Sequence, residues 1–281
     1  MRRQVLASIG LSLLLSACGG GEAPGLGSMT APALSPTVVA SPAPVATTNP
    51  APAPAPAPSP TPTSTPATAS SPTSPATFAN RDGQTVVVAE GDSISVDYGG
   101  YYAGRFKGDH PDISYHIKAV GGSSITTLVA RRSEVLGLRP DALTVFVGAN
   151  DLGGYASGQA YFDALMAYIQ PFRDADVKVL IATPLPRNAS DNPAFNNASN
   201  NHRVELSRLL KEAVGKKIDG VIDFGGDPIV GQLSATTNGQ LYSDGLHPTE
   251  ISFNGAPGGH YYMVRIYDEA MKPILEKIKG Q

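Results

Sequence analysis

A serine placed directly after a short apolar run is the first residue in this chain that could do chemistry. Residues 86–89 are apolar and mostly β-branched, and residues 90–95 read Glu-Gly-Asp-Ser-Ile-Ser. Such a run ending in a glycine-containing turn predicts a buried strand, with Ser93 just past its carboxyl end, where open α/β sheets bind ligands. A serine hydroxyl needs a base to remove its proton. The rest of the chain must therefore supply a base, an orienting acid and donors for an oxyanion.

An aspartate and a histidine near the carboxyl end of the chain could provide the base and the acid that orients it. Asp244 precedes His247 by three residues, in a loop before the last helical pattern. At this spacing the carboxylate can reach the imidazole Nδ1, which fixes the tautomer and leaves Nε2 free to face a nucleophile. An isolated Asp-x-x-His also occurs in solvated loops, so the pair needs support from other motifs.

Two turns could donate hydrogen bonds to a negatively charged oxygen. Asn150 lies in the segment Gly-Ala-Asn-Asp at residues 148–151, and its amide could donate at a strand end, although asparagine is also a common turn residue. Gly121 and Gly122 adjoin in a second turn, where backbone N–H groups can approach a ligand closely. That turn could equally be a plain tight turn.

Strand-like and helix-like patterns alternate through the second part of the chain. Expected strands cover residues 86–89, 113–120, 143–147, 177–181 and 221–224, and expected helices cover residues 98–107, a segment opening at 125, 162–169, 206–213 and 263–274. Pro171 should kink or end the third of these helices. The alternation predicts a parallel sheet with helices on both faces, which gathers the turns described above at the carboxyl ends of the strands.

The four motifs, in this order, resemble the SGNH hydrolase superfamily, also called the GDSL esterase/lipase family. They are Gly-Asp-Ser-Ile at 91–94, Gly122, Gly-Ala-Asn-Asp at 148–151 and Asp-Gly-Leu-His at 244–247. The resemblance implies an α/β fold, a three-layer α/β/α sandwich of flavodoxin-like type with a central parallel sheet of about five strands. It also implies hydrolysis of carboxylic esters without a metal or cofactor.

The same resemblance implies a role for each motif residue. Ser93 would be the nucleophile, His247 the general base and Asp244 its orienting acid. The backbone N–H groups of Ser93 and Gly122, with the Asn150 side chain, would form the oxyanion hole.

The chain departs from the family pattern in three places. Ile94 stands where the family name has leucine, and Gly121 adjoins Gly122, of which the spacing favours Gly122 as the donor. Residues 252–259 delay the last helix and could reshape the mouth of the pocket. His260, near the start of that helix, could line the rim. The elbow Gly-x-Ser-x-Gly of the other large α/β esterase class is absent, and no spacing of Cys, His and Asp suggests zinc.

The amino terminus has the pattern of a bacterial lipoprotein signal. Residues 1–17 contain two arginines followed by an apolar core, as in a secretion signal peptide. Residues 15–18, Leu-Ser-Ala-Cys, resemble the lipobox in which the cysteine becomes the lipidated amino terminus. Cys18 is the only cysteine, so no intramolecular disulfide can form. Gly19 follows it, and we expect a lipid-anchored protein of the bacterial cell envelope, at the outer membrane.

A long segment separates this signal from the expected domain. Residues 18–80 are rich in Ala, Pro, Ser and Thr, and residues 23–80 carry no charge. Such a segment buries too little apolar surface to fold, and its prolines favour extended backbone, which predicts a semi-rigid disordered tether. Residues 81–281 suit one hydrolase domain, expected to be a monomer. A net charge of −3 without a basic patch disfavours a nucleic-acid partner.

The segments near the expected site favour a short-acyl substrate, such as an acetyl ester on a small polar molecule or a glycan. Residues 188–201 and 252–259 are polar or small and are expected to form the rim, leaving no apolar channel for a long acyl chain. Tyr98, Tyr101 and Tyr102 could stack on sugar rings or simply pack a helix. A lysophospholipase or lipase, a thioesterase, an acyltransferase and an inactive envelope binding module remain alternatives.

Overall fold

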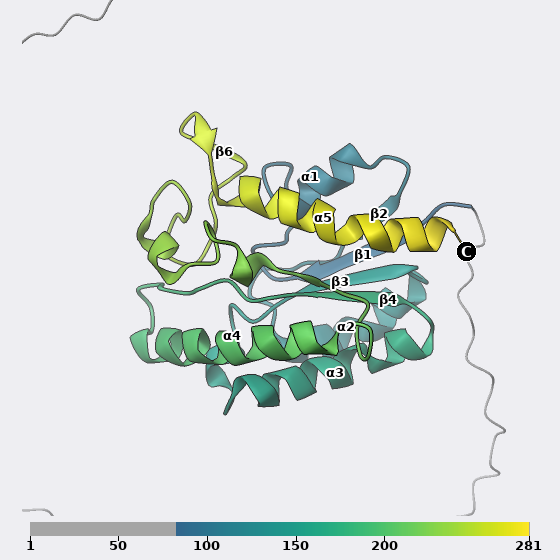
Figure 1. Ribbon diagram of the computed structural model, residues 1–281, viewed down its shortest axis with the longest axis horizontal. Coiled ribbons are helices and arrows are strands. Elements are labelled where there is room, and N and C mark those ends of the chain that lie inside the picture. The colour runs from purple at the N-terminus through teal and green to yellow at the C-terminus, as the bar shows by residue number, and fades with distance from the viewer. Residues whose placement is uncertain (1–82, 281) are drawn as a thin grey trace, which may run out of the picture. The chain divides into compact units, whose positions relative to one another are not determined.

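A central parallel sheet organises residues 83–280, the part of the chain that the computed structural model describes (Figure 1). The sheet has five strands in the order β2-β1-β3-β4-β5. The strands are β1 (Val86–Gly91), β2 (Ser114–Ile117), β3 (Ala142–Phe146), β4 (Lys178–Ala182) and β5 (Gly220–Ile222). The strand order reverses between β1 and β3, and such a switch point is where open α/β sheets bind their ligands.

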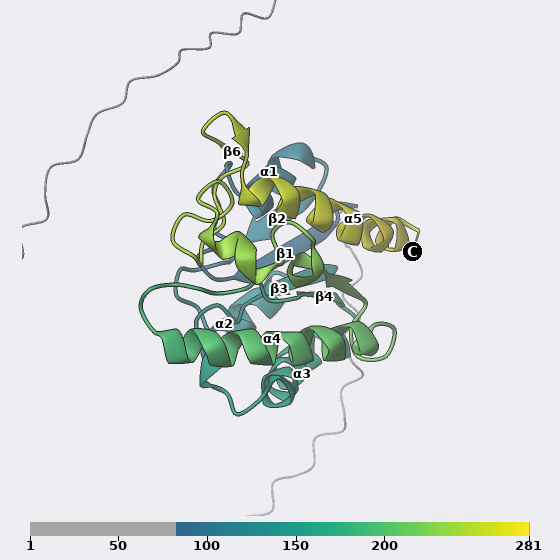
Figure 2. The same cartoon turned by 60° about the vertical axis from the view of Figure 1, so that its left-hand side comes forward.

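Helices cover both faces of this sheet (Figures 1 and 2). One face carries α1 (Tyr102–Asp109) and α5 (Gly259–Lys279). The other carries α2 (Ile125–Gly137), α3 (Gly158–Asp174) and α4 (Pro193–Ala213). Short 3₁₀ helices in the connections are η1 (Leu152–Gly154), η2 (Phe224–Gly226) and η3 (Leu233–Thr237). The arrangement confirms the predicted three-layer α/β/α sandwich with a parallel sheet of five strands.

The two faces of the sheet build two separate cores. Val87 and Ala89 of β1 pack with α1 and α5, whereas Val88 packs with α2 and α3. β3 and β4 are buried along their whole length, as expected for central parallel strands covered on both faces. In the β1–β3 register Gly91 pairs with Phe146, so both strands end at the same edge of the sheet.

Pro171 does not end α3, which was one of the two effects that the sequence predicted for it. The helix continues to Asp174. The side chains of Ile169 and Phe172, on either side of the proline, are fully buried. Burying such side chains stabilises the last turn and offsets the lost hydrogen bond of the proline.

Helices α4 and α5 begin earlier than their apolar patterns indicated. α4 starts at Pro193 because Asn192 accepts a hydrogen bond from the Phe195 N–H (3.0 Å), and proline is tolerated in a first turn. Much of the segment 188–201, expected as a polar rim, therefore lies in this helix. Residues 252–259 form a small hairpin, β6 (Ser252–Phe253) and β7 (Ala256–Pro257), which projects from the sandwich before α5 (Figures 1 and 2).

The amino-terminal predictions fall outside the described residues. They are the signal peptide at 1–17, the lipidated Cys18 and the tether at 18–80. Within residues 83–280, none of the helices combines the length and the apolar character that crossing a membrane requires.

A carboxyl group is buried in β1 without a hydrogen-bond partner. Glu90 is 1% exposed, and neither of its side-chain oxygens has a partner among the described residues. Burial raises the pKa of Glu90 to about 7; the nearby Arg131 guanidinium opposes this rise and Glu134 adds to it. Above pH 7 the fold must therefore hold an unpaired charge in its interior.

We expect Glu90→Gln to stabilise the fold at about pH 8.5 but not at about pH 5. The unfolded chain releases this proton near the ordinary pKa of 4.5, so the raised native pKa lowers stability as the pH increases from 4.5 to about 7. Removing the charge should increase the free energy of unfolding by up to roughly 3 kcal/mol above pH 7. Thermal unfolding at both pH values measures the difference. Glu134→Gln is the control, because that carboxylate is exposed and paired with Lys118; an equal gain in both variants would contradict the role of burial.

Candidate active site

Ser93 lies in the tight turn that follows β1. The Ile94 N–H donates to the Asp92 carboxylate at 3.0 Å, and the Ser95 N–H donates to the Asp92 carbonyl at 3.1 Å. Gly91 is needed at the start of the turn, because a Cβ there would lie 2.5 Å from the Ser95 hydroxyl oxygen. Ser93 is partly exposed, so the turn presents its side chain at the carboxyl edge of the sheet.

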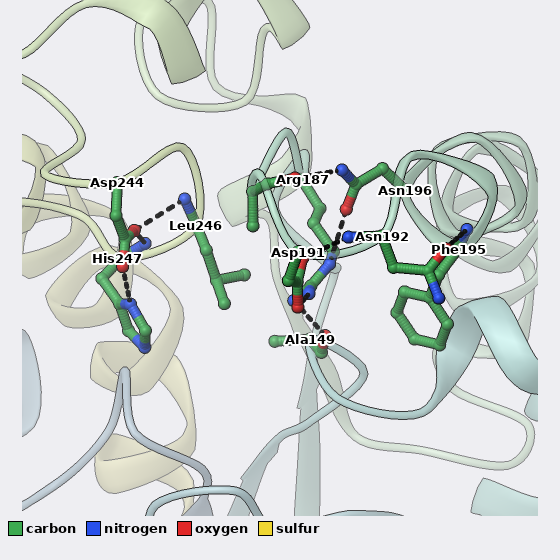
Figure 3. A network of polar contacts seen from close by, with 10 residues as sticks. Ala149, Arg187, Asp191, Asn192, Phe195, Asn196, Asp244, Leu246 and His247 are labelled. Carbon is green, nitrogen blue, oxygen red and sulfur yellow. Dashed lines mark hydrogen bonds and ion pairs between the residues drawn. The ribbon is translucent and has the colours of Figure 1, made fainter.

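Ser93, His247 and Asp244 form a continuous chain of hydrogen bonds. The Ser93 Oγ lies 2.8 Å from His247 Nε2, and His247 Nδ1 lies 2.7 Å from Asp244 Oδ2. Figure 3 shows the Asp244 and His247 end of this chain. Because Nδ1 faces a carboxylate it carries the proton, which leaves Nε2 as the acceptor for the serine hydroxyl. The fold thus joins three of the predicted site residues, although Ser93 and His247 are 154 positions apart.

Hydrogen bonds keep the Asp244 carboxylate ionised. Its Oδ1 accepts from the backbone N–H of Leu246 at 2.9 Å and of His247 at 2.8 Å. Partial burial acts to raise the pKa of Asp244, but these bonds and the His247 imidazole outweigh it and hold the pKa below its usual value. The side chains of Asp244 and His247 are 52% and 34% exposed, so this part of the site opens to solvent.

Asp92, the neighbour of Ser93, occupies a very different environment. It is 1% exposed, and its carboxylate accepts the Ile94 N–H described above. Burial raises the pKa of Asp92 to about 7, against the opposing effects of that hydrogen bond and of His247. Asp92 therefore stabilises the turn from inside the protein, whereas Asp244 holds the His247 ring at the surface.

Asn150 lies in the turn after β3 and is tied to the start of α2. Its side-chain amide donates to the Ser123 carbonyl at 3.0 Å. The next residue, Asp151, accepts the Ile125 N–H and the Tyr161 hydroxyl, both at 2.8 Å. An amide group carries two N–H donors, so one remains for another acceptor. Asn150 itself is exposed, and no other hydrogen bond among the described residues uses this second donor.

The turn that contains Gly121 and Gly122 passes beside Ser93. A Cβ on Gly121 would lie 4.0 Å from the Ser93 Cβ. Gly122 has a φ of +76°, in the left-handed region that favours glycine. Both glycines are exposed. The assignment of the Ser93 and Gly122 N–H groups as oxyanion donors stays a prediction.

Two aromatic residues that could have lined the rim are interior. His260 is fully buried; its Nδ1 accepts the Tyr102 N–H at 3.3 Å, and its ring stacks on Tyr101 with centroids 4.1 Å apart. Burial lowers the pKa of His260 to about 3, and the charge of His247 adds to this effect, so the ring is neutral. Tyr102 is also in the core, whereas Tyr98 is 48% exposed. Of the three tyrosines, Tyr98 and the partly buried Tyr101 remain available to a substrate.

Sequence reasoning missed a buried arginine close to Asn150. Arg187 is 6% exposed and donates to the carbonyl of Ala149 at 2.9 Å (Figure 3). Its only signal in the sequence is its position directly after the Pro-Leu-Pro stretch that follows β4. Within residues 83–280, no group of three or more Cys, His, Asp or Glu side chains is arranged to hold a metal ion.

A parallel α/β/α sandwich with a Ser-His-Asp chain at the carboxyl edge of its sheet is typical of serine hydrolases. The family model of the GDSL-like lipase/acylhydrolase family matches residues 89–251, and the chain belongs to this family. It is therefore a hydrolase that acts on ester bonds. The comparison with curated proteins gave no match.

Solved structures show the same fold at low sequence identity. A protein assigned as an acylhydrolase, from Bacteroides fragilis NCTC 9343, is 21% identical with a TM-score of 0.54, over 69% of this chain and 88% of that one. A protein assigned to the lipolytic G-D-S-L family, from Desulfitobacterium hafniense DCB-2, is 19% identical with a TM-score of 0.52, over 66% and 99%. A member of that family from Veillonella parvula DSM 2008 is 17% identical with a TM-score of 0.51, over 67% and 98%.

The loop that carries Asp244 and His247 is fastened by Gly245. Its carbonyl accepts the Asn188 N–H at 2.8 Å, and its φ is +78°. A Cβ on Gly245 would lie 2.4 Å from the Asn188 carbonyl oxygen, so any larger residue must displace backbone. Gly245 therefore sets how closely this loop approaches the segment after β4.

We expect Gly245→Ala to lower both the Tm and the kcat of ester hydrolysis, because the loop must move away from Asn188. Gly255→Ala is the matched control. Gly255 has a similar φ of +75° but has open space where a Cβ would lie, so it should show only the cost of the left-handed conformation, about 1–2 kcal/mol. Thermal unfolding and steady-state kinetics compare the two. Equal losses of kcat in both variants would contradict a special role for the Gly245 contact.

Proposed function

We propose that this protein is a serine esterase in which Ser93 is the nucleophile, His247 the general base and Asp244 the residue that orients it. The observation that carries the proposal is the unbroken hydrogen-bond chain from Ser93 to Asp244, with spacings of 2.8 and 2.7 Å. A nucleophile, a base and an orienting acid in hydrogen-bond contact are the elements that serine acyl transfer requires.

The proposed reaction proceeds through an acyl-enzyme. His247 Nε2 takes the proton as the Ser93 Oγ bonds to the ester carbonyl carbon, and the carbonyl oxygen becomes an oxyanion. The Ser93 and Gly122 N–H groups and the free N–H of Asn150 donate to that oxygen. The intermediate collapses, the alkoxy oxygen leaves with the proton from His247, and the acyl group stays on Ser93. A water molecule, deprotonated by His247, then releases the carboxylic acid by the same steps.

Two features support a short-acyl ester on a polar molecule or a glycan as the substrate. The base and its acid are open to solvent, which suits a large hydrophilic alcohol part. Tyr98 is exposed and packs edge-on against Tyr101 with centroids 5.1 Å apart, which gives an aromatic surface for a sugar ring.

A lipid substrate is the alternative with an observation in its favour. Val120 directly precedes Gly121 and Gly122 and is 50% exposed, so an apolar side chain lies next to the proposed oxyanion donors. An acyl chain gains about 0.8 kcal/mol for each methylene group that it buries. The dependence of the rate on acyl length therefore separates the two substrate classes.

The decisive experiment compares p-nitrophenyl esters from acetyl to palmitoyl on the wild type and Ser93→Ala. We expect kcat/KM to fall from acetyl and butyryl to decanoyl and longer esters, and the loss of the nucleophile to lower kcat by at least about 10⁴-fold. Circular dichroism verifies that the variant is folded. Wild-type turnover by a folded Ser93→Ala would remove Ser93 from the mechanism. A preference for decanoyl or palmitoyl esters, or for lysophospholipid over acetylated sugar, would replace the short-acyl substrate with a lipid.

We also propose that the enzyme acts at the bacterial cell envelope, held to the outer membrane through a lipidated Cys18. The support is the Leu-Ser-Ala-Cys sequence at residues 15–18 and the long Pro- and Ala-rich segment after it, which could hold the domain away from the lipid surface.

Cys18→Ser should move the enzyme from the membrane fraction to the soluble fraction of its host, because the acyl chains supply the anchoring energy. Fractionation followed by immunoblotting measures this, and Ser16→Thr serves as a control that keeps the cysteine. A Cys18→Ser protein that stays with the membrane without detergent would rule out the lipid anchor.

A further inference from the structure

A buried guanidinium lies behind the turn that presents Asn150. Arg187 directs all three of its nitrogens at protein acceptors: Nη1 at the Ala149 carbonyl (2.9 Å), Nε at the Asn196 side-chain oxygen (2.7 Å) and Nη2 at the Asp191 carboxylate (2.6 Å). Figure 3 shows the side chain between these partners. An arginine that makes planar contacts in three directions is held in one orientation.

The backbone of Arg187 is fixed as well. Its N–H donates to the Asn200 side-chain oxygen at 3.0 Å, and its carbonyl accepts from the Asn200 side-chain nitrogen at 2.7 Å. The Phe195 ring centroid lies 5.1 Å from the guanidinium carbon. Three residues of α4 therefore hold Arg187. Two of them, Asn196 and Asn200, are asparagines of the segment that was expected to form a polar rim.

The hydrogen bond from Arg187 to the Ala149 carbonyl acts on the backbone of Asn150. The Ala149 carbonyl belongs to the peptide group that continues into Asn150, so its hydrogen bond with Arg187 fixes the plane of that peptide. The side chain of Asn150 is fixed from the other side by the Ser123 carbonyl. The next residue after Arg187, Asn188, is hydrogen-bonded to Gly245 in the triad loop. The two consecutive residues Arg187 and Asn188 thus contact both the turn that carries Asn150 and the loop that carries Asp244 and His247.

We propose that Arg187 is a positioning residue that sets the Asn150 amide at the place where the oxyanion forms. The proposal rests on the proposed function, in which Asn150 is an oxyanion donor. Donors of this kind act only when they are aimed at the charge of the transition state, and small displacements weaken them steeply. Lysine cannot replace arginine in this role, because a single ammonium cannot make planar contacts with Ala149, Asn196 and Asp191 together.

The test is a double-mutant cycle of Arg187→Lys and Asn150→Ala, assayed with p-nitrophenyl acetate. Asn150→Ala alone should lower kcat about 10²–10³-fold. Arg187→Lys alone should lower kcat about 10-fold or more with little change in KM, because transition-state stabilisation is lost rather than substrate binding. If Arg187 acts through Asn150, adding Arg187→Lys to Asn150→Ala should cause almost no further loss.

A purely structural role would give a different pattern. General loosening of the fold would lower kcat by the same factor in the wild type and in Asn150→Ala, and that result would overturn the proposal, as would wild-type kcat in Arg187→Lys. Arg203→Lys is the control. Arg203 lies in α4 and also donates to a backbone carbonyl, that of Gly231 at 3.3 Å, but it makes no hydrogen bond to the Asn150 turn. This variant should keep the wild-type kcat.

Two additions keep the outcome interpretable. If Arg187→Lys does not fold, Asn196→Ser replaces it, because that change removes the hydrogen-bond partner of Arg187 Nε while the arginine stays. Asn196→Ser should lower kcat in the wild type but not in the Asn150→Ala background. A loss of kcat that persists in Asn150→Ala would overturn the proposal. Ser93→Ala is assayed in parallel. Loss of activity in Ser93→Ala together with wild-type kcat in Arg187→Lys would reject the positioning role alone, whereas retained activity in Ser93→Ala would reject the proposed function.

Discussion

The site depends on one constraint: the carboxyl ends of parallel strands must meet at one edge of the sheet. β1 ends in the turn that carries Ser93, and β3, its neighbour, ends just before Asn150. The strand order reverses between these two strands, and ligands of open α/β sheets bind at such a switch point. The hydrogen bond from Ser93 to His247 can form only because the loop before α5 returns to this edge.

The surface of the site and its support have opposite characters. Asp244 and His247 are open to water, where single hydrogen bonds are weak and mobile. The residues that support the Asn150 turn are less exposed: the side chain of the buried Arg187 has three hydrogen-bond partners, and that of the partly buried Asp151 has two. An open site that must still aim its donors accurately needs this kind of rigid support, because solvent cannot hold an amide in place.

The same edge also concentrates unfavourable burial of charge. Burial raises the pKa of both Glu90 and Asp92 to about 7, and Glu90 has no hydrogen-bond partner among the described residues. Glu90 and Asp92 lie three residues and one residue before Ser93, the proposed nucleophile. Stability is commonly lower at functional sites, where the geometry that chemistry requires conflicts with the best packing. Because both pKa values are raised, these two carboxyl groups lower the stability of the fold as the pH rises toward 7.

The sequence by itself determined the alternation of strands and helices along the chain, the class of fold and the three residues of the Ser-His-Asp chain. These depend on local signals: β-branched runs, apolar periodicity, and the short motifs around Ser93, Asn150 and His247. Local signals failed where packing outweighed them, as in the continuation of α3 through Pro171. They left open whether Tyr102 and His260 face the rim or the core, and packing places both in the core.

Only the tertiary structure decided the spacings of 2.8 and 2.7 Å in the triad, the openness of Asp244 and the place of Arg187 behind Asn150. Arg187 and Ala149 are 38 positions apart, and no periodicity in either segment indicates that they touch. Hydrogen bonds between distant segments depend on how the helices and strands pack, and the pattern of residues within one segment carries no record of its partner in another.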